Sequence, residues 1–142
     1  MNKKSRIPSS LAELQLFADI PSSQLRRASS LLTPVSVGAG EVLLTQGKVA
    51  REFLIVAGGL VSVSRADDDG AEELTVVNPG EVLGEMSLLH GGPRSATVTA
   101  LVPTSLFVAT PQEFFALLKA VPSAAEQIVR TANERLRANM AA

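Results

Sequence analysis

Glycines divide the middle of this chain into short apolar runs, and that pattern limits the folds the chain can adopt. Apolar and polar residues alternate over 35–37 and 61–64, as they do in half-buried strands. The run 53–56 has strand length, and the sequence Asp-Asp-Asp-Gly at 67–70 indicates a hairpin. Further strands are expected over 41–44, 72–77, 97–100 and 105–109. Short strands at this spacing predict a small antiparallel barrel or jelly roll.

Helices are expected on both sides of this strand region. Ser10 and Glu13 have the spacing of a capping box, which predicts a helix start, and a second short helix is expected over about 22–32. Downstream, 110–113 combines a capping box with proline at the first helical position. A further capping box at 123–126 predicts the start of a long final helix. This order of elements predicts an α+β domain.

Length and composition narrow the class further. The 142 residues suffice for one domain with a core, which we assign to 10–142, and residues 1–9 are expected to be a disordered basic leader. A net charge of −1 disfavours a dedicated nucleic-acid binder. The apolar runs are too short to span a membrane, so a cytoplasmic protein is expected. Without cysteine and with His90 as the one histidine, neither a thiolate site nor a multi-histidine metal site is available, and no cofactor is expected.

The segment 82–98 places a carboxylate and a guanidinium nine residues apart, with glycines and a short turn between them. Glu85 follows Gly84 directly, where free backbone N–H groups at the start of a turn can face an anion. Arg94 can clamp that anion with its planar fork, and Glu85 can accept hydrogen bonds from sugar hydroxyls. One phosphate beside one ribose is the shape of a cyclic nucleotide.

The same segment resembles the phosphate-binding cassette of the cyclic nucleotide-binding domain family, of the cAMP receptor protein and protein kinase A regulatory subunit type. The family pattern F-G-E-x-[AS]-L, followed by P-R-[STA]-A-[TS]-V, is matched at about ten positions, and Leu83 stands where many members have an aromatic residue. Segments 16–20, 40–47 and 55–63 also resemble the family, so the resemblance covers about 10–137. It implies an antiparallel, jelly-roll-like β-roll of about eight strands, flanked by N-terminal helices and two C-terminal helices.

The resemblance also implies roles for individual residues. Arg94 would pair with the cyclic phosphate, and Glu85 would accept a hydrogen bond from the ribose 2′-hydroxyl. The phosphate and sugar would be lined, mostly through backbone groups, by Gly84, Met86, Ser87, Ser95 and Ala96. The purine would pack against Leu74, Val77 and Leu83, for which a plain core position is an almost equally good interpretation. The Ser95 hydroxyl could reach either the phosphate or a guanine amino group, so the choice between cAMP and cGMP stays open.

In this family the C-terminal helix closes over the base as a lid. Arg130, Asn133 and Arg137 lie about one turn apart and share a face that could meet the purine edge, although a solvated face explains them equally well. Ligand capture would rearrange a hinge near 109–123. The apolar stripe of the final helix is compatible with a homodimer, and no helix-turn-helix follows it, so we expect no DNA binding by this chain alone.

The predicted function is therefore a regulatory module that binds cAMP, or cGMP, and couples capture to movement of the C-terminal helix. Its effector, a separate protein or an attached domain, is not named by the sequence. The alternative is a degenerate domain of the same fold that serves as a protein–protein interaction surface; the intact Glu85 and Arg94 favour the first interpretation. A metal enzyme on a small β-barrel is disfavoured by the single histidine, and no enzymatic activity is expected.

Overall fold

The computed structural model describes residues 11–138, so the predicted leader over 1–9 lies outside the described residues. Within them, the strands are β1 (Thr33–Val37), β2 (Val42–Leu44), β3 (Phe53–Gly58), β4 (Val61–Asp67), β5 (Gly70–Val77), β6 (Val82–Leu83), β7 (Thr97–Ala100) and β8 (Thr104–Ala109). The helices are α1 (Ser22–Leu31), α2 (Glu85–His90), α3 (Pro111–Ala120) and α4 (Pro122–Arg137). Two 3-10 turns, η2 (Leu11–Glu13) and η3 (Gln15–Phe17), precede α1.

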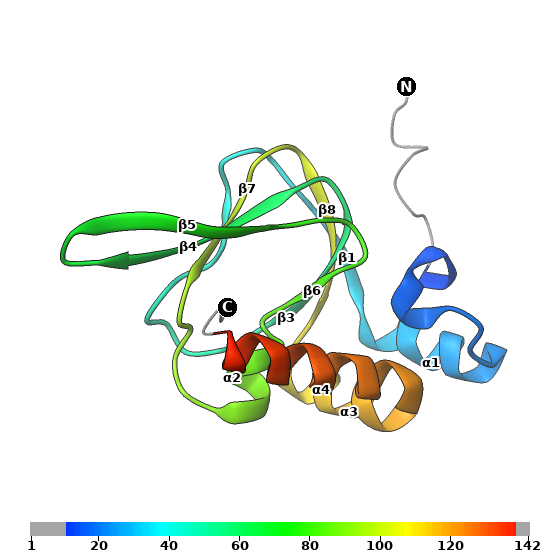
Figure 1. The fold of residues 1–142 in the computed structure, drawn as a ribbon. Helices are drawn as coiled ribbons and strands as arrows, with labels where there is room; N and C mark the ends of the chain where they lie inside the picture. The colour runs from blue at the N-terminus through cyan, green and yellow to red at the C-terminus, as the bar shows by residue number, and fades with distance from the viewer. Residues whose placement is uncertain (1–10, 139–142) are drawn as a thin grey trace.

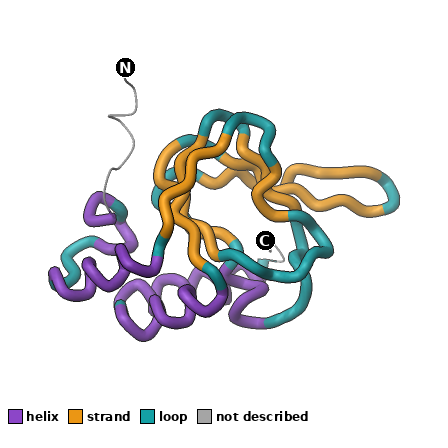
Figure 2. Tube along the Cα trace, turned by 180° about the vertical axis from the view of Figure 1, so that it is seen from behind, coloured by secondary structure: helices purple, strands orange, loops and turns teal. Residues whose placement is uncertain are grey.

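The strands form two four-stranded antiparallel sheets, in the orders β1-β8-β3-β6 and β2-β7-β4-β5. The sheets curl into a roll, and α2, α3 and α4 lie together against one end of it while α1 lies to one side (Figure 1). The view from behind shows the same separation into a strand layer and a helix layer (Figure 2). The prediction of an α+β β-roll with flanking helices is confirmed.

Strand β3 is buried on both faces and separates two apolar cores, which is why its sequence is a continuous apolar run rather than an alternating one. Because successive side chains point to opposite faces, Phe53 and Ile55 pack with the helices. Leu54 and Val56 pack inside the roll. One strand therefore connects the interior of the roll to the helical layer.

The helical layer is held on the roll by aromatic and small apolar side chains. The ring of Phe114 on α3 lies 4.7 Å from that of Phe53, in a tilted arrangement. On α4, the residues buried against the layer are Ala124, Ile128 and Ala132, a spacing of four that forms one helical face. The capping box predicted at Thr110 and Glu113 is present and starts α3.

Two predicted helix starts are wrong. Separate 3-10 turns stand where Ser10 and Glu13 predicted a helix, because Leu14 and Leu16 are both buried and an α-helix would turn residues two apart to nearly opposite sides. The final helix begins at Pro122 with no side-chain cap, rather than being capped by Ser123. Proline suits the first helical position because it lacks the N–H that would be unsatisfied there.

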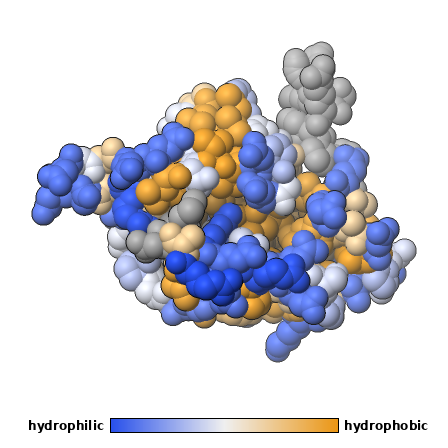
Figure 3. Space-filling view, in the orientation of Figure 1, coloured by the Kyte–Doolittle hydropathy of each residue, from blue (hydrophilic) through white to orange (hydrophobic). Residues whose placement is uncertain are grey.

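The hairpin predicted at the run of aspartates is confirmed and projects from the roll. Asp67 pairs with Gly70 at its tip, and the hairpin extends well beyond the neighbouring strands (Figure 1). Its far end and the exposed surface of α4 are hydrophilic, while apolar side chains show over part of the roll (Figure 3). None of the described helices is long and apolar enough to cross a membrane.

Candidate functional site

A left-handed glycine sets up the site at the junction of β6 and α2. Gly84 has φ of +86°, and a Cβ built on it would lie 2.7 Å from the carbonyl oxygen of Glu52 and 3.0 Å from Nη1 of Arg94. A side chain at this position is therefore disfavoured for two reasons: the positive φ strains any residue other than glycine, and the space for a Cβ is already filled. The chain leaves Gly84 directly into α2, whose first residue, Glu85, is 0% exposed.

Arg94 is buried against the other side of this junction. Its side chain reaches back to the chain before α2, where Nη1 donates to the Gly84 carbonyl at 2.8 Å and Nη2 donates to the Glu52 carbonyl. The residue is only 2% exposed. Both acceptors are neutral carbonyl oxygens, so this buried cation is hydrogen-bonded here without a carboxylate on its fork.

The Glu85 carboxylate is bound by a residue of the final helix. Nη1 of Arg135 donates to Oε1 and Oε2 of Glu85, at 2.9 Å each, and to the carbonyl oxygen of Val82 at 2.8 Å. The Arg135 side chain is 19% exposed, whereas that of Glu85 is fully enclosed. The Glu85 carboxylate, which was predicted to bind the ribose 2′-hydroxyl, thus forms an ion pair between α2 and α4.

Burial dominates the electrostatics of both charged groups. It raises the pKa of the Glu85 carboxyl above its ordinary value, while the charges of Arg135 and Arg94 oppose that rise. Burial also lowers the pKa of the Arg94 guanidinium, against the opposing charges of Glu52 and Glu85. Glu85 and Arg94 are therefore close enough to influence each other, although each is hydrogen-bonded to other groups.

Ser95, the residue that follows Arg94, has an unsatisfied hydroxyl. Its Oγ is buried and has no hydrogen-bond partner in the part of the chain that the structure describes. Its carbonyl oxygen accepts from Nε of Arg65 on β4 at 3.1 Å. A buried hydroxyl without a hydrogen-bond partner costs free energy, and in the residue that follows Arg94 it fits a ligand with several acceptor oxygens.

The remaining predicted binding residues are spread between the cassette and the core. Ala96 is buried, and Ser87 is buried with its hydroxyl oriented toward the Pro93 carbonyl at 3.4 Å. Met86 is half-buried on α2. Val77 and Leu83 belong to the apolar core inside the roll, and Leu74 stands half-buried at the irregularity in the pairing of β4 with β5.

The predicted lid residues do not reach the site in this structure, and a neighbour on the same helix does. Arg130, Asn133 and Arg137 are exposed, whereas Arg135 meets Glu85. The sequence did contain an indication of this residue, because position 135 continues the buried face of Ile128 and Ala132 by one further turn. A cation on a buried face needs a buried partner, which Glu85 provides.

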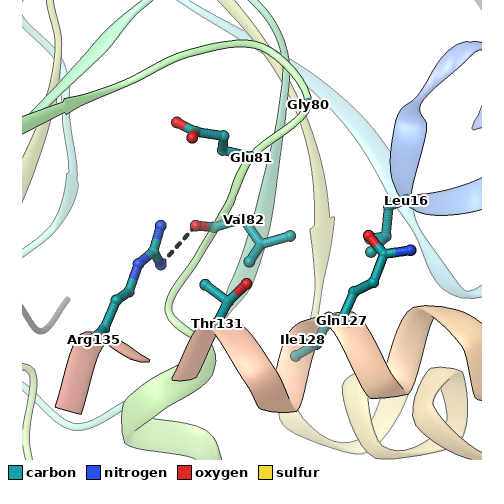
Figure 4. Close-up of a pocket in the computed structure, with 8 residues that line it drawn as sticks. All are labelled: Leu16, Gly80, Glu81, Val82, Gln127, Ile128, Thr131 and Arg135. Carbon is teal, nitrogen blue, oxygen red and sulfur yellow. Dashed lines mark hydrogen bonds between the residues drawn. The ribbon is translucent and has the colours of Figure 1, made fainter. Parts of the chain in front are cut away.

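A small cavity of about 150 Å³ lies beside Arg135, between α4 and the segment before α2. It is lined by Leu16, Gly80, Glu81, Val82, Gln127, Ile128, Thr131 and Arg135. Figure 4 shows Arg135 extending from α4 to the Val82 carbonyl along one side of this cavity. Because its lining contains none of the predicted binding residues, the cavity is distinct from the Glu85 and Arg94 site. Within 11–138, no group of acidic or histidine side chains is arranged to hold a metal ion.

Comparison with known proteins decides the family. Residues 34–121 match the model of the cyclic nucleotide-binding domain, a span that includes both Glu85 and Arg94. The chain belongs to the cyclic nucleotide-binding domain family. It is a regulatory domain of the type found in the cAMP receptor protein and in protein kinase A regulatory subunits.

Individual relatives of this cyclic nucleotide-binding domain differ in what surrounds the shared fold. The acetyltransferase Pat of Mycolicibacterium smegmatis is 35% identical over 90% of this chain and 38% of its own. A cAMP-dependent protein kinase regulatory subunit of Yarrowia lipolytica is 31% identical over 76% of this chain and 28% of its own. The crystal structure of the Thermus thermophilus catabolite activator protein superposes with a TM-score of 0.76 at 30% identity, covering 87% of this chain and 59% of that one.

The comparison with Pat corrects one prediction. From its residues the chain was expected not to be an enzyme, yet it is similar to over a third of an acetyltransferase. Enzymatic activity therefore occurs among proteins that carry a domain of this kind, while the domain itself is regulatory. The chain spans about a third of the length of the two curated relatives above, so the domain is the part that they share with it.

Proposed function

We propose that this domain binds cAMP reversibly at Glu85, Arg94 and Ser95, and that binding is coupled to movement of α4. In this arrangement Arg94 clamps the cyclic phosphate, Ser95 donates its free hydroxyl to a phosphate oxygen, and Glu85 accepts from the ribose 2′-hydroxyl. The observation that carries the proposal is that two consecutive residues, Arg94 and Ser95, bury a guanidinium without a carboxylate bonded to it and a hydroxyl without a hydrogen-bond partner among the described residues. An anion supplies what both groups lack.

Arg94 is prepared for this role by its present hydrogen bonds. The carbonyls of Gly84 and Glu52 hold two guanidinium nitrogens and leave further N–H donors of the fork for a ligand. Neutral carbonyls orient the cation without cancelling its charge. A phosphate therefore gains both the charge and a preset geometry, which lowers the entropic cost of binding.

Coupling to α4 follows from competition for one carboxylate. Arg135 bonds to both oxygens of Glu85 and the Glu85 side chain is fully enclosed, so a ribose hydroxyl that reaches this carboxylate competes with Arg135 for it. The ligand then shifts the population toward states in which α4 has given up its contact with Glu85. How far it shifts depends on the difference in ligand affinity between the two states. An effector, in the same chain or in a partner, would sense the new position of α4.

The first experiment is calorimetric titration of the nucleotide-stripped protein with cAMP and then with cGMP. Because the chain has neither tryptophan nor tyrosine, intrinsic fluorescence is a poor substitute. We expect micromolar or tighter binding of cAMP, and the titration with cGMP measures the preference between the two bases. Amide exchange along α4, with and without cAMP, tests the coupling, and we expect faster exchange near Arg135 in the complex.

The controls separate the two parts of the proposal. Arg94→Ala should abolish the heat of cAMP binding, and Arg26→Ala, on the exposed surface of α1, should leave it unchanged. Binding without any change in α4 exchange would refute the coupling alone. No heat and no shift in melting temperature with either nucleotide would refute binding and favour the protein–protein interaction module.

A further inference from the structure

We infer that the Gln46 side chain is a positioning residue for the phosphate-binding segment: by bonding to β4, it fixes the turn that holds the backbone of Arg94. The inference rests on the proposed function, because it concerns the same Arg94, but its geometry is independent of which ligand binds. The sequence assigned no role to Gln46 beyond its place in the segment 40–47.

The first step is the contact between Gln46 and β4. Its Nε2 donates to the carbonyl of Ala66 at 2.9 Å, and its Oε1 accepts from the N–H of Ala66 at 2.8 Å. This paired bonding imitates the way in which a neighbouring strand would satisfy Ala66. A neighbouring strand is needed there because the pairing of β4 with β7 ends at Ser64 and Thr97. The Gln46 amide thus continues the sheet beyond the end of β7.

The second step connects Gln46 to the phosphate-binding segment. The N–H of Gly47 donates to the Arg94 carbonyl at 2.7 Å, and the N–H of Arg94 donates to the Lys48 carbonyl at 2.8 Å. The backbone N–H of Gln46 also donates to the Thr97 hydroxyl at 3.0 Å. The turn at 45–48 therefore bonds to the chain on both sides of Ser95, and the Gln46 side chain anchors this turn to β4.

The third step is the consequence for the Arg94 side chain. The guanidinium of Arg94 reaches the Gly84 and Glu52 carbonyls from a backbone that the turn holds in place. If the turn were released from β4, the Arg94 backbone would gain freedom, and the ligand would have to order it again at an entropic cost. Gln46 acts on ligand affinity through Arg94, without touching the phosphate itself.

The test compares isosteric and conservative variants. Gln46→Met keeps the length of the side chain and removes both bonds to Ala66, while Gln46→Glu keeps the acceptor and loses the donor. Gln112→Met changes an exposed glutamine on α3 and is the matched control. We expect Gln46→Met to weaken cAMP affinity about ten-fold, as the loss of two ordered hydrogen bonds would, with Gln46→Glu between it and the control.

A double-mutant cycle with Arg94→Lys distinguishes positioning from general stability. If Gln46 acts through the Arg94 fork, Gln46→Met should cost little further affinity once that fork is gone. Equal losses in both backgrounds, or no loss relative to Gln112→Met, would overturn the inference. Melting temperatures of all variants show whether any loss follows from partial unfolding, and Gln46→Glu serves if Gln46→Met does not fold.

Amide exchange keeps this inference separate from the proposed function. Gln46→Met should accelerate exchange at Gly47 and Arg94, whose N–H groups make the bonds of the turn, and leave α1 unchanged. This measurement needs no ligand. If the wild-type protein bound neither cyclic nucleotide, the proposed function would fail while exchange at these two amides still decided the role of Gln46. Unchanged exchange there would refute it.

Discussion

Arg135 and Glu85 stand 50 positions apart, yet one nitrogen of the arginine lies 2.9 Å from each carboxylate oxygen of the glutamate. The pair joins the last helix to the first residue of α2. A buried charge that loses its partner costs several kcal/mol, so in this state the two helices stabilise each other's position. Any ligand that requires Glu85 therefore acts on α4 as well.

Removing Arg135 tests whether it competes with the ribose hydroxyl for Glu85 or helps to hold the ligand. In Arg135→Ala we expect cAMP affinity to rise several-fold, because the ribose hydroxyl no longer competes for Glu85, and stability to fall by about 1–3 kcal/mol because Glu85 stays buried without its cation. Arg130→Ala, an exposed position on the same helix, should change neither. Calorimetry and denaturant unfolding measure the two effects. A lower affinity in Arg135→Ala would mean that Arg135 helps to hold the ligand.

Arg94→Ala should affect binding far more than folding. The variant loses charge-assisted hydrogen bonds to the phosphate, and we expect affinity to fall at least about 100-fold. It also leaves the carbonyls of Gly84 and Glu52 without their donor, at a cost of about 1–3 kcal/mol of stability. Calorimetric titration measures the fall in affinity, and thermal unfolding measures the fall in stability. Unchanged affinity would remove Arg94 from the site.

Gly84→Ala tests the space beside the guanidinium, with Gly40→Ala as its matched control. Both glycines have φ near +90°, so both variants carry the same backbone strain of about 1 kcal/mol. Only at Gly84 would the new Cβ collide with the Glu52 carbonyl and Arg94, whereas the space around Gly40 is open. We expect Gly84→Ala alone to lose cAMP affinity, and equal behaviour of the two variants would contradict this account.

The raised pKa of Glu85 predicts how stability depends on pH. Since the folded protein holds the Glu85 proton more tightly than the unfolded chain does, the contribution of Glu85 to the unfolding free energy falls as pH rises from its ordinary pKa to its raised one. The unfolding free energy of the wild type should therefore gain a stabilising contribution from Glu85 as pH is lowered through this window, and denaturant unfolding at a series of pH values measures it.

Glu85→Gln provides the control for that titration. This variant keeps the shape of the side chain and has no carboxyl group to titrate. The difference in unfolding free energy between wild type and Glu85→Gln should shift in favour of wild type as pH is lowered through the window. A difference that does not change with pH would show that Glu85 keeps its ordinary pKa in the folded protein.

The residues that sequence reasoning could find are those whose chemistry is tied to local order. The phosphate-binding cassette could be predicted because Gly84, Glu85 and Arg94 lie within one short segment. The short apolar runs between glycines predicted the strands around it. The capping box at Thr110 and the hairpin after Asp67 are local in the same sense, and both are present. Local signals predicted the roll and the place of its helices.

What sequence reasoning missed depends on contacts between distant segments. Arg130, Asn133 and Arg137 were chosen for their spacing, but nothing in spacing alone says which helix face meets Glu85, and Arg135 holds that position. Gln46 was passed over for the same reason, since its partner Ala66 lies 20 residues away on another strand. The spacing of Ser123 and Glu126 predicted a capped start, but α4 begins one residue earlier, at Pro122, with no side-chain cap.

A single residue joins α3 to α4, so a small rotation at this residue produces a large displacement at the other end of α4. Val121 follows the last residue of α3 and precedes the first residue of α4, and its backbone, with φ of −131° and ψ of 84°, is not helical. At 1.5 Å per residue, Arg135 lies about 21 Å along the axis from this pivot. A rotation of about 10° at Val121 would carry its guanidinium about 4 Å, more than the present separation from Glu85. A torsional change in one peptide unit is therefore sufficient to engage or release the far end of the helix.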